Sequence, residues 1–175
     1  MTKEQPWEYM DDNTVLFWGG ILSNWYKSPF DIDGVQYNCV EQFMMYRKAM
    51  VFGDTATAQL IMLNSNPREQ KMLGRQVQNF DAAVWEARCL EEVLPGILAK
   101  FGQNESLKEL LLSTGNRIIA EASPYDAIWG IGLGAEDPDA RDPAKWQGKN
   151  YLGELLMVAR DWFRATVIAR EQVGL

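Results

Sequence analysis

The segment Val40–Phe52, VEQFMMYRKAMVF, constrains the fold most, because it predicts a helix that is mostly apolar yet carries an acid and a base. Glu41 and Lys48 are seven residues apart, so both lie on one helical face, about 10 Å apart along the axis. Met45 and Phe52 fall on the same stripe. Ionisable groups on such a face are partly desolvated, and desolvated titratable groups are candidates for a functional site.

Two interpretations of this pair stay open. In the structural one, Glu41 and Lys48 form an ion pair or are two solvated helix charges, although two helical turns exceed the usual i,i+4 spacing. A lysine whose stem lies along apolar surface would also explain Lys48. In the functional one, desolvation keeps Lys48 partly neutral, so that it attacks a carbonyl-like carbon while Glu41 handles protons or stabilises positive charge. The two titrations would then be coupled.

Length and composition indicate one domain over residues 1–175, since 47% of the residues are hydrophobic and seven are Trp. There is no apolar run near 18 residues, and the start of the sequence is polar and acidic, which predicts a cytoplasmic protein without a membrane partner. Cys39 and Cys89 stand alone in the sequence, so we expect buried reduced thiols rather than a zinc site or a disulfide framework.

The chain contains no histidine, which excludes Ser/His and Cys/His triads, HExxH zinc sites and any histidine general base. Catalysis must therefore use Glu, Asp, Lys, Tyr or Ser. The glycines of Gly130–Gly134 lack the spacing of a dinucleotide-binding loop, so they are a weak signal for a cofactor. The net charge of −7 disfavours broad attraction to nucleic acid or to anionic membranes, but it leaves a local basic pocket open.

The pattern of elements indicates an α+β fold, mostly helical with a small sheet. Residues 14–18 and 117–122 are predicted strands, and Asp33-Gly34 a hairpin turn. Asp54 and Asp81 are predicted helix N-caps, and Pro95-Gly96 is expected to interrupt the helix that Asp81 begins. The predicted helices are 40–52, 55–63, 67–78, 82–94 with a continuation at 97–101, 106–113 and 151–170. Residues 139–150 are predicted loop, and the last helix has its apolar side at Leu152, Leu155, Leu156, Ala159, Trp162 and Phe163.

Three further polar clusters have both a structural and a functional interpretation. In SPYDAIWGIGLG, Asp126 can cap its own turn while Trp129 packs in the core, or Asp126 can hold a sugar hydroxyl while Trp129 stacks on a base. Before the last helix, Asn150 is by default an N-cap, whereas Lys149 beside free helical amides suits a phosphate. Trp18, Gly19, Gly20, Ser23 and Asn24 form either a turn or a polar-lined mouth; Arg75 and Trp85 are equally ambiguous.

Five stretches, FWGGILSNWYKSPF, YNCVEQFMMYRKAMVFGD, LGRQVQNFDAAVW, KFGQN with LLSTGNRIIAEASPYDAIWGIGL, and WQGKNYLGELLMVAR, together resemble the NADAR (YbiA-like) family of N-glycosidases. The resemblance runs from about residue 17 to residue 160. Its strongest parts are the Glu-x6-Lys helix, the D-x-x-W-G loop and the final G-K-N-x-L-G-x-x-L-M. Their order along the chain makes a chance match implausible.

The resemblance implies cleavage of a ribose–nitrogen bond without metal or cofactor. The implied substrates are small nucleotides, such as ADP-ribosylated guanine, free or in nucleic acid, or phosphoribosylamino-pyrimidine intermediates of riboflavin synthesis. Glu41 matches the essential acid of the family, and Lys48 matches the lysine proposed to form a Schiff base with the opened ribose. Asp126 is carried over as a third catalytic residue, and the implied substrate-binding residues are Trp18, Gly19, Ser23, Asn24, Arg75, Trp85, Trp129, Gly130, Lys149 and Asn150.

Two points stay open at the level of sequence. Many relatives have His directly after the catalytic Glu, whereas this chain has Gln42, so the role of that histidine is lost or is taken by an amide. A non-catalytic domain that binds ADP-ribose or NAD in the same pocket is the alternative function. The presence of both Glu41 and Lys48 argues against it, because a pure binder needs neither.

Overall fold

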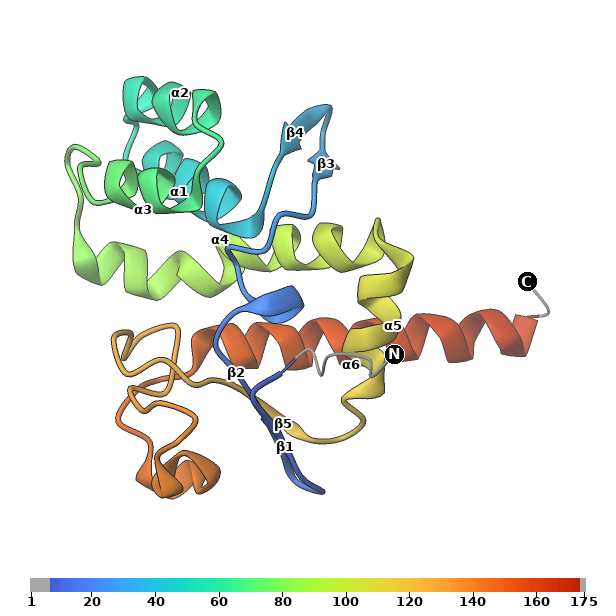
Figure 1. Cartoon of the computed structure of the whole chain (residues 1–175). Coiled ribbons are helices and arrows are strands. Elements are labelled where there is room, and N and C mark those ends of the chain that lie inside the picture. The colour runs from blue at the N-terminus through green and yellow to red at the C-terminus, as the bar shows by residue number, and fades with distance from the viewer. Residues whose placement is uncertain (1–6, 174–175) are drawn as a thin grey trace. The chain divides into compact units, whose positions relative to one another are not determined.

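A computed structural model describes residues 7–173, without the side chains of residues 170–173. Within that range the chain forms six α-helices, five short strands and three 3₁₀ turns, which confirms the predicted α+β class (Figure 1). Its contacts divide it into two compact units, unit 1 (Met1–Ser23 and Glu105–Leu175) and unit 2 (Asn24–Asn104). The prediction of one domain over residues 1–175 stays a prediction. No helix in the described part of the chain is long and apolar enough to cross a membrane.

Unit 2 consists of a hairpin and four helices. The hairpin pairs β3 (Phe30–Ile32) with β4 (Val35–Tyr37), and the helices are α1 (Val40–Val51), α2 (Thr55–Leu63), α3 (Pro67–Gly74) and α4 (Ala82–Gly102). The predicted turn is confirmed, because Asp33 and Gly34 both have positive φ, at 54° and 79°, as a two-residue hairpin turn requires. Helix α1 packs against α2, α3 and α4, so it is the central helix of the unit (Figure 1).

The two predicted caps begin two of the four helices of unit 2, α2 and α4. The Asp54 carboxylate accepts a hydrogen bond from Thr57 N at 3.0 Å, and that of Asp81 accepts one from Ala83 N at 2.9 Å. Asp54 also accepts from Gln78 N at 2.8 Å. This second bond holds the chain outside a helix, so α3 ends at Gly74, and the prediction that it continues to residue 78 is wrong.

The predicted interruption at Pro95-Gly96 is also wrong, because α4 continues through both residues to Gly102. A Cβ on Gly96 would lie 2.4 Å from Cδ1 of Phe43, so the glycine lets α4 approach α1 closely. The packing gained against α1 therefore outweighs the backbone hydrogen bond that Pro95 cannot make.

Unit 1 has a three-stranded sheet in the order β1 (Tyr9–Met10), β2 (Thr14–Phe17), β5 (Ile118–Glu121). β1 is antiparallel to β2, and β2 is parallel to β5 with Val15 opposite Ile119. The sequence predicted the two longer strands but missed β1, which is only two residues long. The 3₁₀ turn η1 (Gly20–Leu22) follows β2, and the expected loop before the last helix contains two more, η2 (Pro138–Arg141) and η3 (Pro143–Lys145).

The helices of unit 1 are α5 (Glu105–Ser113) and α6 (Tyr151–Val173), and α6 packs against β5. The predicted apolar side of α6 is buried at five of its six positions, Leu152, Leu155, Leu156, Ala159 and Phe163. Trp162 is 52% exposed, so its assignment to the buried side is wrong. It lies roughly 80° from the middle of the buried stripe, at the edge where a large ring extends into solvent.

Both cysteines are free and buried, as predicted. Cys39 is the N-cap residue of α1, and its thiol donates to Gln70 Oε1 at 3.4 Å. Burial raises the pKa of the Cys39 thiol to about 11, which makes it a poor nucleophile near neutral pH.

Candidate functional site

The first turn of α1 buries the predicted acid. Glu41 is 2% exposed, and its backbone N–H donates to the carbonyl of Asn24 at 2.9 Å. The structure thus brings together two residues that the sequence assigned to the site. A carboxylate in the first turn of a helix lies at the positive end of the helix dipole, which stabilises its ionised form.

Asn24 is itself 5% exposed, and its side-chain oxygen has no hydrogen-bond partner among the residues that the structure describes. Buried amide oxygens are nearly always paired, because leaving one unpaired costs about 1–3 kcal/mol. An unsatisfied acceptor beside the backbone of Glu41 is therefore a position where a bound donor group would be stabilised.

Lys48, two turns further along α1, is partly buried. Its ammonium donates to the carbonyl of Gly74 at 2.8 Å and lies 4.0 Å from the centre of the Phe80 ring. Both contacts favour the charged form, but desolvation outweighs them and lowers the pKa of Lys48. The charge of Glu41 raises this pKa and that of Arg75 lowers it, so the acid and the base of α1 interact electrostatically.

The contact between Lys48 and α3 depends on a glycine. A Cβ on Gly74 would lie 2.0 Å from Sδ of Met45, one helical turn before Lys48 on α1. Only glycine lets the end of α3 come this close, and the approach places the Gly74 carbonyl within reach of the lysine. The sequence missed this support and that of Phe80, because neither contact has a local signal in the chain.

Arg75 and Trp85 complete the predicted site residues of unit 2. Arg75 directly follows α3, is exposed, and acts on Lys48 through its charge. Trp85 is partly buried in the first turn of α4, where its backbone N–H donates to the carbonyl of Asp81. Within residues 7–173 no hydrogen bond or ring contact joins Trp85 to Glu41 or Lys48.

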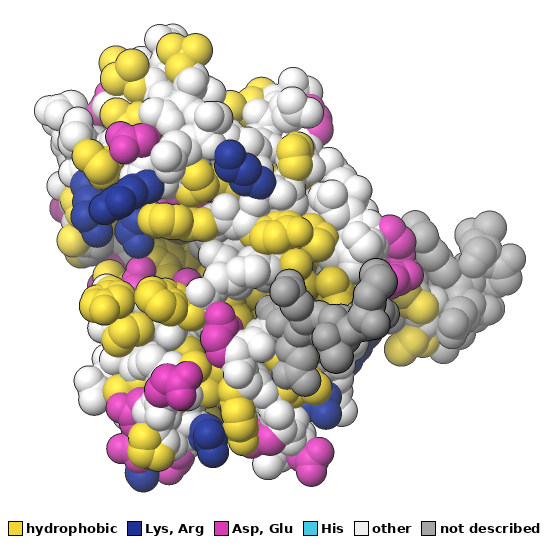
Figure 2. Space-filling model, viewed as in Figure 1, with side chains coloured by type: hydrophobic (Ala, Val, Ile, Leu, Met, Phe, Trp, Pro, Cys, Tyr) yellow, Lys and Arg dark blue, Asp and Glu magenta, His cyan; other side chains and the backbone are white. Residues whose placement is uncertain are grey.

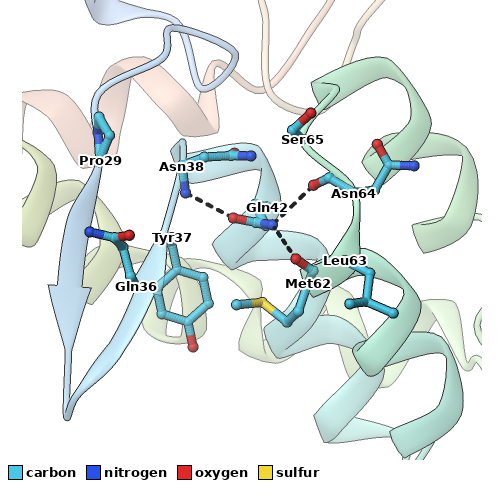
Figure 3. Close-up of a pocket in the computed structure, with 9 residues that line it drawn as sticks. All are labelled: Pro29, Gln36, Tyr37, Asn38, Gln42, Met62, Leu63, Asn64 and Ser65. Carbon is cyan, nitrogen blue, oxygen red and sulfur yellow. Dashed lines mark hydrogen bonds between the residues drawn. The ribbon is translucent and has the colours of Figure 1, made fainter.

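Gln42 connects α1 to the end of α2 and to Asn64, the residue that follows it. It is 3% exposed; its Oε1 accepts from Asn38 N at 2.8 Å, and its Nε2 donates to the carbonyls of Ile61, Met62 and Asn64. Figure 3 shows this carboxamide at the wall of a pocket of about 210 Å³. Because every donor and acceptor of the amide binds backbone, Gln42 serves the fold and does not replace a catalytic histidine.

Unit 2 also holds a buried lysine that the sequence did not single out. Lys100 of α4 is fully buried, with its ammonium 5.0 Å from the Phe101 ring centre and 5.6 Å from that of Tyr26. Desolvation lowers its pKa to about 7, and the charge of Cys39 opposes that change. A single lysine within an apolar helix repeat gives no sequence signal of this kind.

In unit 1 the loop after β5 is organised by Asp126. Its Oδ1 accepts hydrogen bonds from Ile128 N at 3.1 Å and from Trp129 N at 2.9 Å, which is the turn of the structural interpretation. Trp129 is partly buried and packs edge-on against Tyr151 at 6.2 Å. A Cβ on Gly130 would lie 2.8 Å from the Asp126 carbonyl, so this position requires glycine for its close packing.

Asn150 attaches the start of α6 to the sheet of unit 1. The residue is 2% exposed; its Oδ1 accepts from Glu121 N at 3.1 Å, and its Nδ2 donates to Ile119 O at 2.9 Å. Its side chain thus bridges to β5 and is not the cap of α6 that the default interpretation expected. Lys149 beside it is exposed, with its ammonium 5.4 Å from the Tyr151 ring.

The remaining predicted residues lie just after β2. Trp18 is 55% exposed and lies 6.1 Å from the ring of Tyr125, which is 84% exposed. Gly19 has φ of 138°, a conformation that side chains disfavour. Ser23 is buried, and its backbone N–H donates to the Gly20 carbonyl at 3.1 Å.

Comparison with known proteins adds independent information. The NADAR domain model matches residues 16–164. N-glycosidase R617 of Acanthamoeba polyphaga mimivirus is 42% identical over 146 residues, which cover 81% of this chain and 86% of that protein. The chain is also similar to 18% of the Zea mays riboflavin biosynthesis protein PYRR, with 36% identity over 120 residues, or 66% of this chain. The NMR structure of Escherichia coli YbiA superposes with a TM-score of 0.75 at 27% identity, covering 91% of this chain and 90% of that one.

Proposed function

The chain belongs to the NADAR family, and from that premise we propose that it hydrolyses a ribose–nitrogen N-glycosidic bond, with Glu41 and Lys48 as the catalytic pair. The observation that carries the proposal is the desolvation of both groups on one helix. On α1, Glu41 is buried, and desolvation lowers the pKa of Lys48. A scaffold seldom retains a desolvated acid and base that interact only through charge, whereas an enzyme needs them.

Glu41 supplies charge where the reaction creates it. Cleavage of the bond between C1′ and the base nitrogen develops positive charge on C1′ and O4′, and a buried carboxylate stabilises that charge more strongly than an exposed one. The same carboxylate can accept a proton from the attacking group. It lies in the first turn of α1, where the positive end of the helix dipole favours a negative charge.

Lys48 supplies the nucleophile. Its neutral amine forms a bond from Nζ to C1′ as the C1′–N bond breaks, and the electron pair goes to the base nitrogen, which takes up a proton. The ring C1′–O4′ bond then breaks, O4′ is protonated, and a C1′=Nζ imine remains. Water adds to C1′ and the amine leaves, so the net reaction consumes one water and yields the free base and the sugar with a C1′ hydroxyl, its phosphate-bearing part unchanged. A lowered pKa raises the fraction of Lys48 that is neutral at pH 7.

The other residues are assigned to substrate binding. We propose that Asn24 Oδ1 accepts a hydrogen bond from a substrate hydroxyl or amine, since that oxygen has no hydrogen bond to the described residues. Asp126, which the resemblance carries over as a third catalytic residue, would hold a hydroxyl of the reacting ribose, and Trp18 and Trp129 would offer aromatic faces. Asn150 and Gly130 would instead shape the loop that carries these groups.

Two substrate classes follow from the names of the relatives and from the resemblance in the sequence. One is ADP-ribosylated guanine, as nucleoside or in nucleic acid; the other is a phosphoribosylamino-pyrimidine of riboflavin synthesis. A side-by-side assay on both, with the released base and sugar identified by mass, decides between them. Release of neither product by protein that still binds ADP-ribose would establish the non-catalytic alternative.

The covalent step has its own test. Borohydride added during turnover is expected to reduce the imine and leave a sugar adduct on the peptide that contains Lys48. Lys48→Ala abolishes the adduct, whereas Lys27→Ala, which changes an exposed lysine of the same unit, retains it. Turnover without any adduct would mean that Glu41 acts without covalent catalysis.

A further inference from the structure

The segment Asn24–Tyr26 runs beside the start of α1, as the bond from Glu41 N to Asn24 O shows. Trp25 is 43% exposed and Tyr26 is 38% exposed, although both are large aromatic side chains. Asn24 turns inward, so the segment presents a buried acceptor and exposed rings within three residues of one another. Neither Trp25 nor Tyr26 is among the site residues predicted from the sequence, where residues 21–30 are too rich in turn formers and aromatics to predict an element.

Cations lie beside these rings. The ammonium of Lys71 lies 5.9 Å from the centre of the Trp25 ring. Lys71 lies in the last turn of α3 and Arg75, four residues on, is its C-cap residue, so their Cβ atoms lie on one face, roughly 6 Å apart. The charge of Arg75 in turn lowers the pKa of Lys48. Lys48 donates a hydrogen bond to the residue before Arg75, Arg75 is four residues from Lys71, and Lys71 lies beside the indole of Trp25, so we take the order as Lys48, Arg75, Lys71 and Trp25.

This order matches the order of chemical groups in a nucleotide. Arginine and lysine bind phosphate oxygens through charge-assisted hydrogen bonds, and an exposed indole stacks on a base with about 1–3 kcal/mol per base. Figure 2 shows Lys and Arg side chains gathered beside exposed hydrophobic ones on the part of the surface that unit 2 forms. Unit 2 is also nearly neutral, with 8 Lys and Arg against 9 Asp and Glu, so an anion is repelled little there.

A structural explanation exists for the same residues. Lys71 lies in the last turn of α3, where a cation complements the helix dipole, and its contact with Trp25 would fix the segment to the helix. In that case changes at Trp25 and Lys71 alter stability and leave ligand binding unchanged. The two explanations therefore differ in a measurable way.

We infer that Trp25, Lys71 and Arg75 form a binding subsite for the part of the substrate that does not react, namely a phosphate group followed by an aromatic base. The inference rests on the proposed function, since it takes the ribose next to Lys48 as the reacting sugar. Trp25 would stack on the base, and the two cations would hold the phosphate. The subsite makes the enzyme selective for substrates that carry a second base beyond the phosphate.

The test measures binding in the Glu41→Gln background, which separates it from turnover. The probes are ADP-ribose, ribose 5-phosphate and adenosine, titrated by calorimetry. Trp25→Ala is expected to weaken ADP-ribose binding about 10-fold and to leave ribose 5-phosphate unchanged, whereas Trp25→Phe stays within about 3-fold of the parent. Lys71→Met weakens both phosphate-bearing probes and reduces the salt dependence of binding.

Matched controls use the same substitutions elsewhere. Trp162→Ala removes an exposed indole of unit 1, and Lys27→Met removes an exposed lysine of unit 2; neither changes the affinities, and thermal melts verify that all variants fold. Equal affinity of Trp25→Ala and parent for ADP-ribose overturns the subsite, as does a parent that binds ADP-ribose no better than ribose 5-phosphate. Failure of the proposed function would give a different result. Wild-type protein would bind ADP-ribose but leave the substrate uncleaved.

Discussion

The predicted site residues of the two units differ in what their polar side chains bind. In unit 1, Asn150 and Asp126 bind backbone groups of their own unit and so serve the architecture of β5 and the loop after it. In unit 2, Asn24 has an unsatisfied buried oxygen and Lys48 has a lowered pKa, both of which are unfavourable for the folded state alone. At these two residues we expect a ligand or a reaction to compensate for the loss of stability.

Charge separates the units in the same direction. Unit 1 carries 9 Lys and Arg against 15 Asp and Glu, whereas unit 2 carries 8 against 9. Most of the net charge of −7 therefore belongs to unit 1, and a phosphorylated substrate meets little repulsion at α1 and α3 of unit 2. The overall acidity of the chain would have hidden this difference, which appears only when the residues are assigned to units.

The largest expected effect is on catalysis in unit 2. Glu41→Gln should lower kcat at least about 1,000-fold, or about 4 kcal/mol, because it removes the charge that stabilises the transition state while keeping the shape of the side chain. Steady-state release of free base measures the change. Glu69→Gln, an exposed position on α3, is the control and should retain full activity. If Glu41→Gln turned over substrate at the wild-type rate, unit 2 would no longer differ from unit 1 by holding the catalytic acid.

The next effect concerns the stability of unit 2. Lys100→Met should raise the free energy of unfolding at pH 7 by about 3 kcal/mol, since the buried ammonium of the wild type is destabilised by desolvation. The pKa of Lys100 is about 7 when folded against 10.5 unfolded, so between these values the unfolded chain binds the extra proton. Wild-type stability therefore rises with pH across that window relative to the variant.

Urea titrations of both proteins at pH 6, 8 and 10 check this prediction. Lys27→Met serves as the control, because Lys27 is exposed and its removal should leave the pH dependence as it is. Parallel stability curves for wild type and Lys100→Met would show that the buried lysine does not titrate in this window.

A smaller effect on stability is expected in unit 1. Asn150→Ala should lower the free energy of unfolding by about 2–3 kcal/mol, because it leaves the backbone groups of Glu121 and Ile119 without their partner. Asn13→Ala, at an exposed position of the same unit, should change the free energy of unfolding by less than about 0.5 kcal/mol. If Asn150→Ala instead kept its stability and raised KM, Asn150 would bind substrate, as the family resemblance implies.

The smallest effect tests whether unit 1 contributes to binding. Trp129→Ala should raise KM about 10-fold, or about 1.4 kcal/mol, with kcat nearly unchanged, since a stacked ring contributes uniform binding. Trp162→Ala on α6 provides the comparison and should leave both constants as they are. A loss of kcat equal to that of Glu41→Gln would place Trp129 in the chemistry.

Local chemistry made much of the fold predictable. Aspartates before helices, Gly53 with φ of 71° after α1, and the Asp33-Gly34 turn act over a few residues, so their consequences follow from the neighbouring sequence. The failures at Pro95 and at the end of α3 arose where a partner distant in sequence overrode the local preference. In the first case this was Phe43 packing on Gly96, and in the second the Asp54 carboxylate binding Gln78.

By itself, the sequence determined the helix that carries Glu41 and Lys48, because helical periodicity alone places positions seven apart on one face. It also determined that no histidine takes part in the chemistry. Only the tertiary structure decided that Lys48 rests on the Gly74 carbonyl, that Gln42 binds backbone and that Lys100 is fully buried. Burial and hydrogen-bond partners depend on which distant segments pack against a helix, and that packing sets the electrostatics from which a side chain acquires its chemistry.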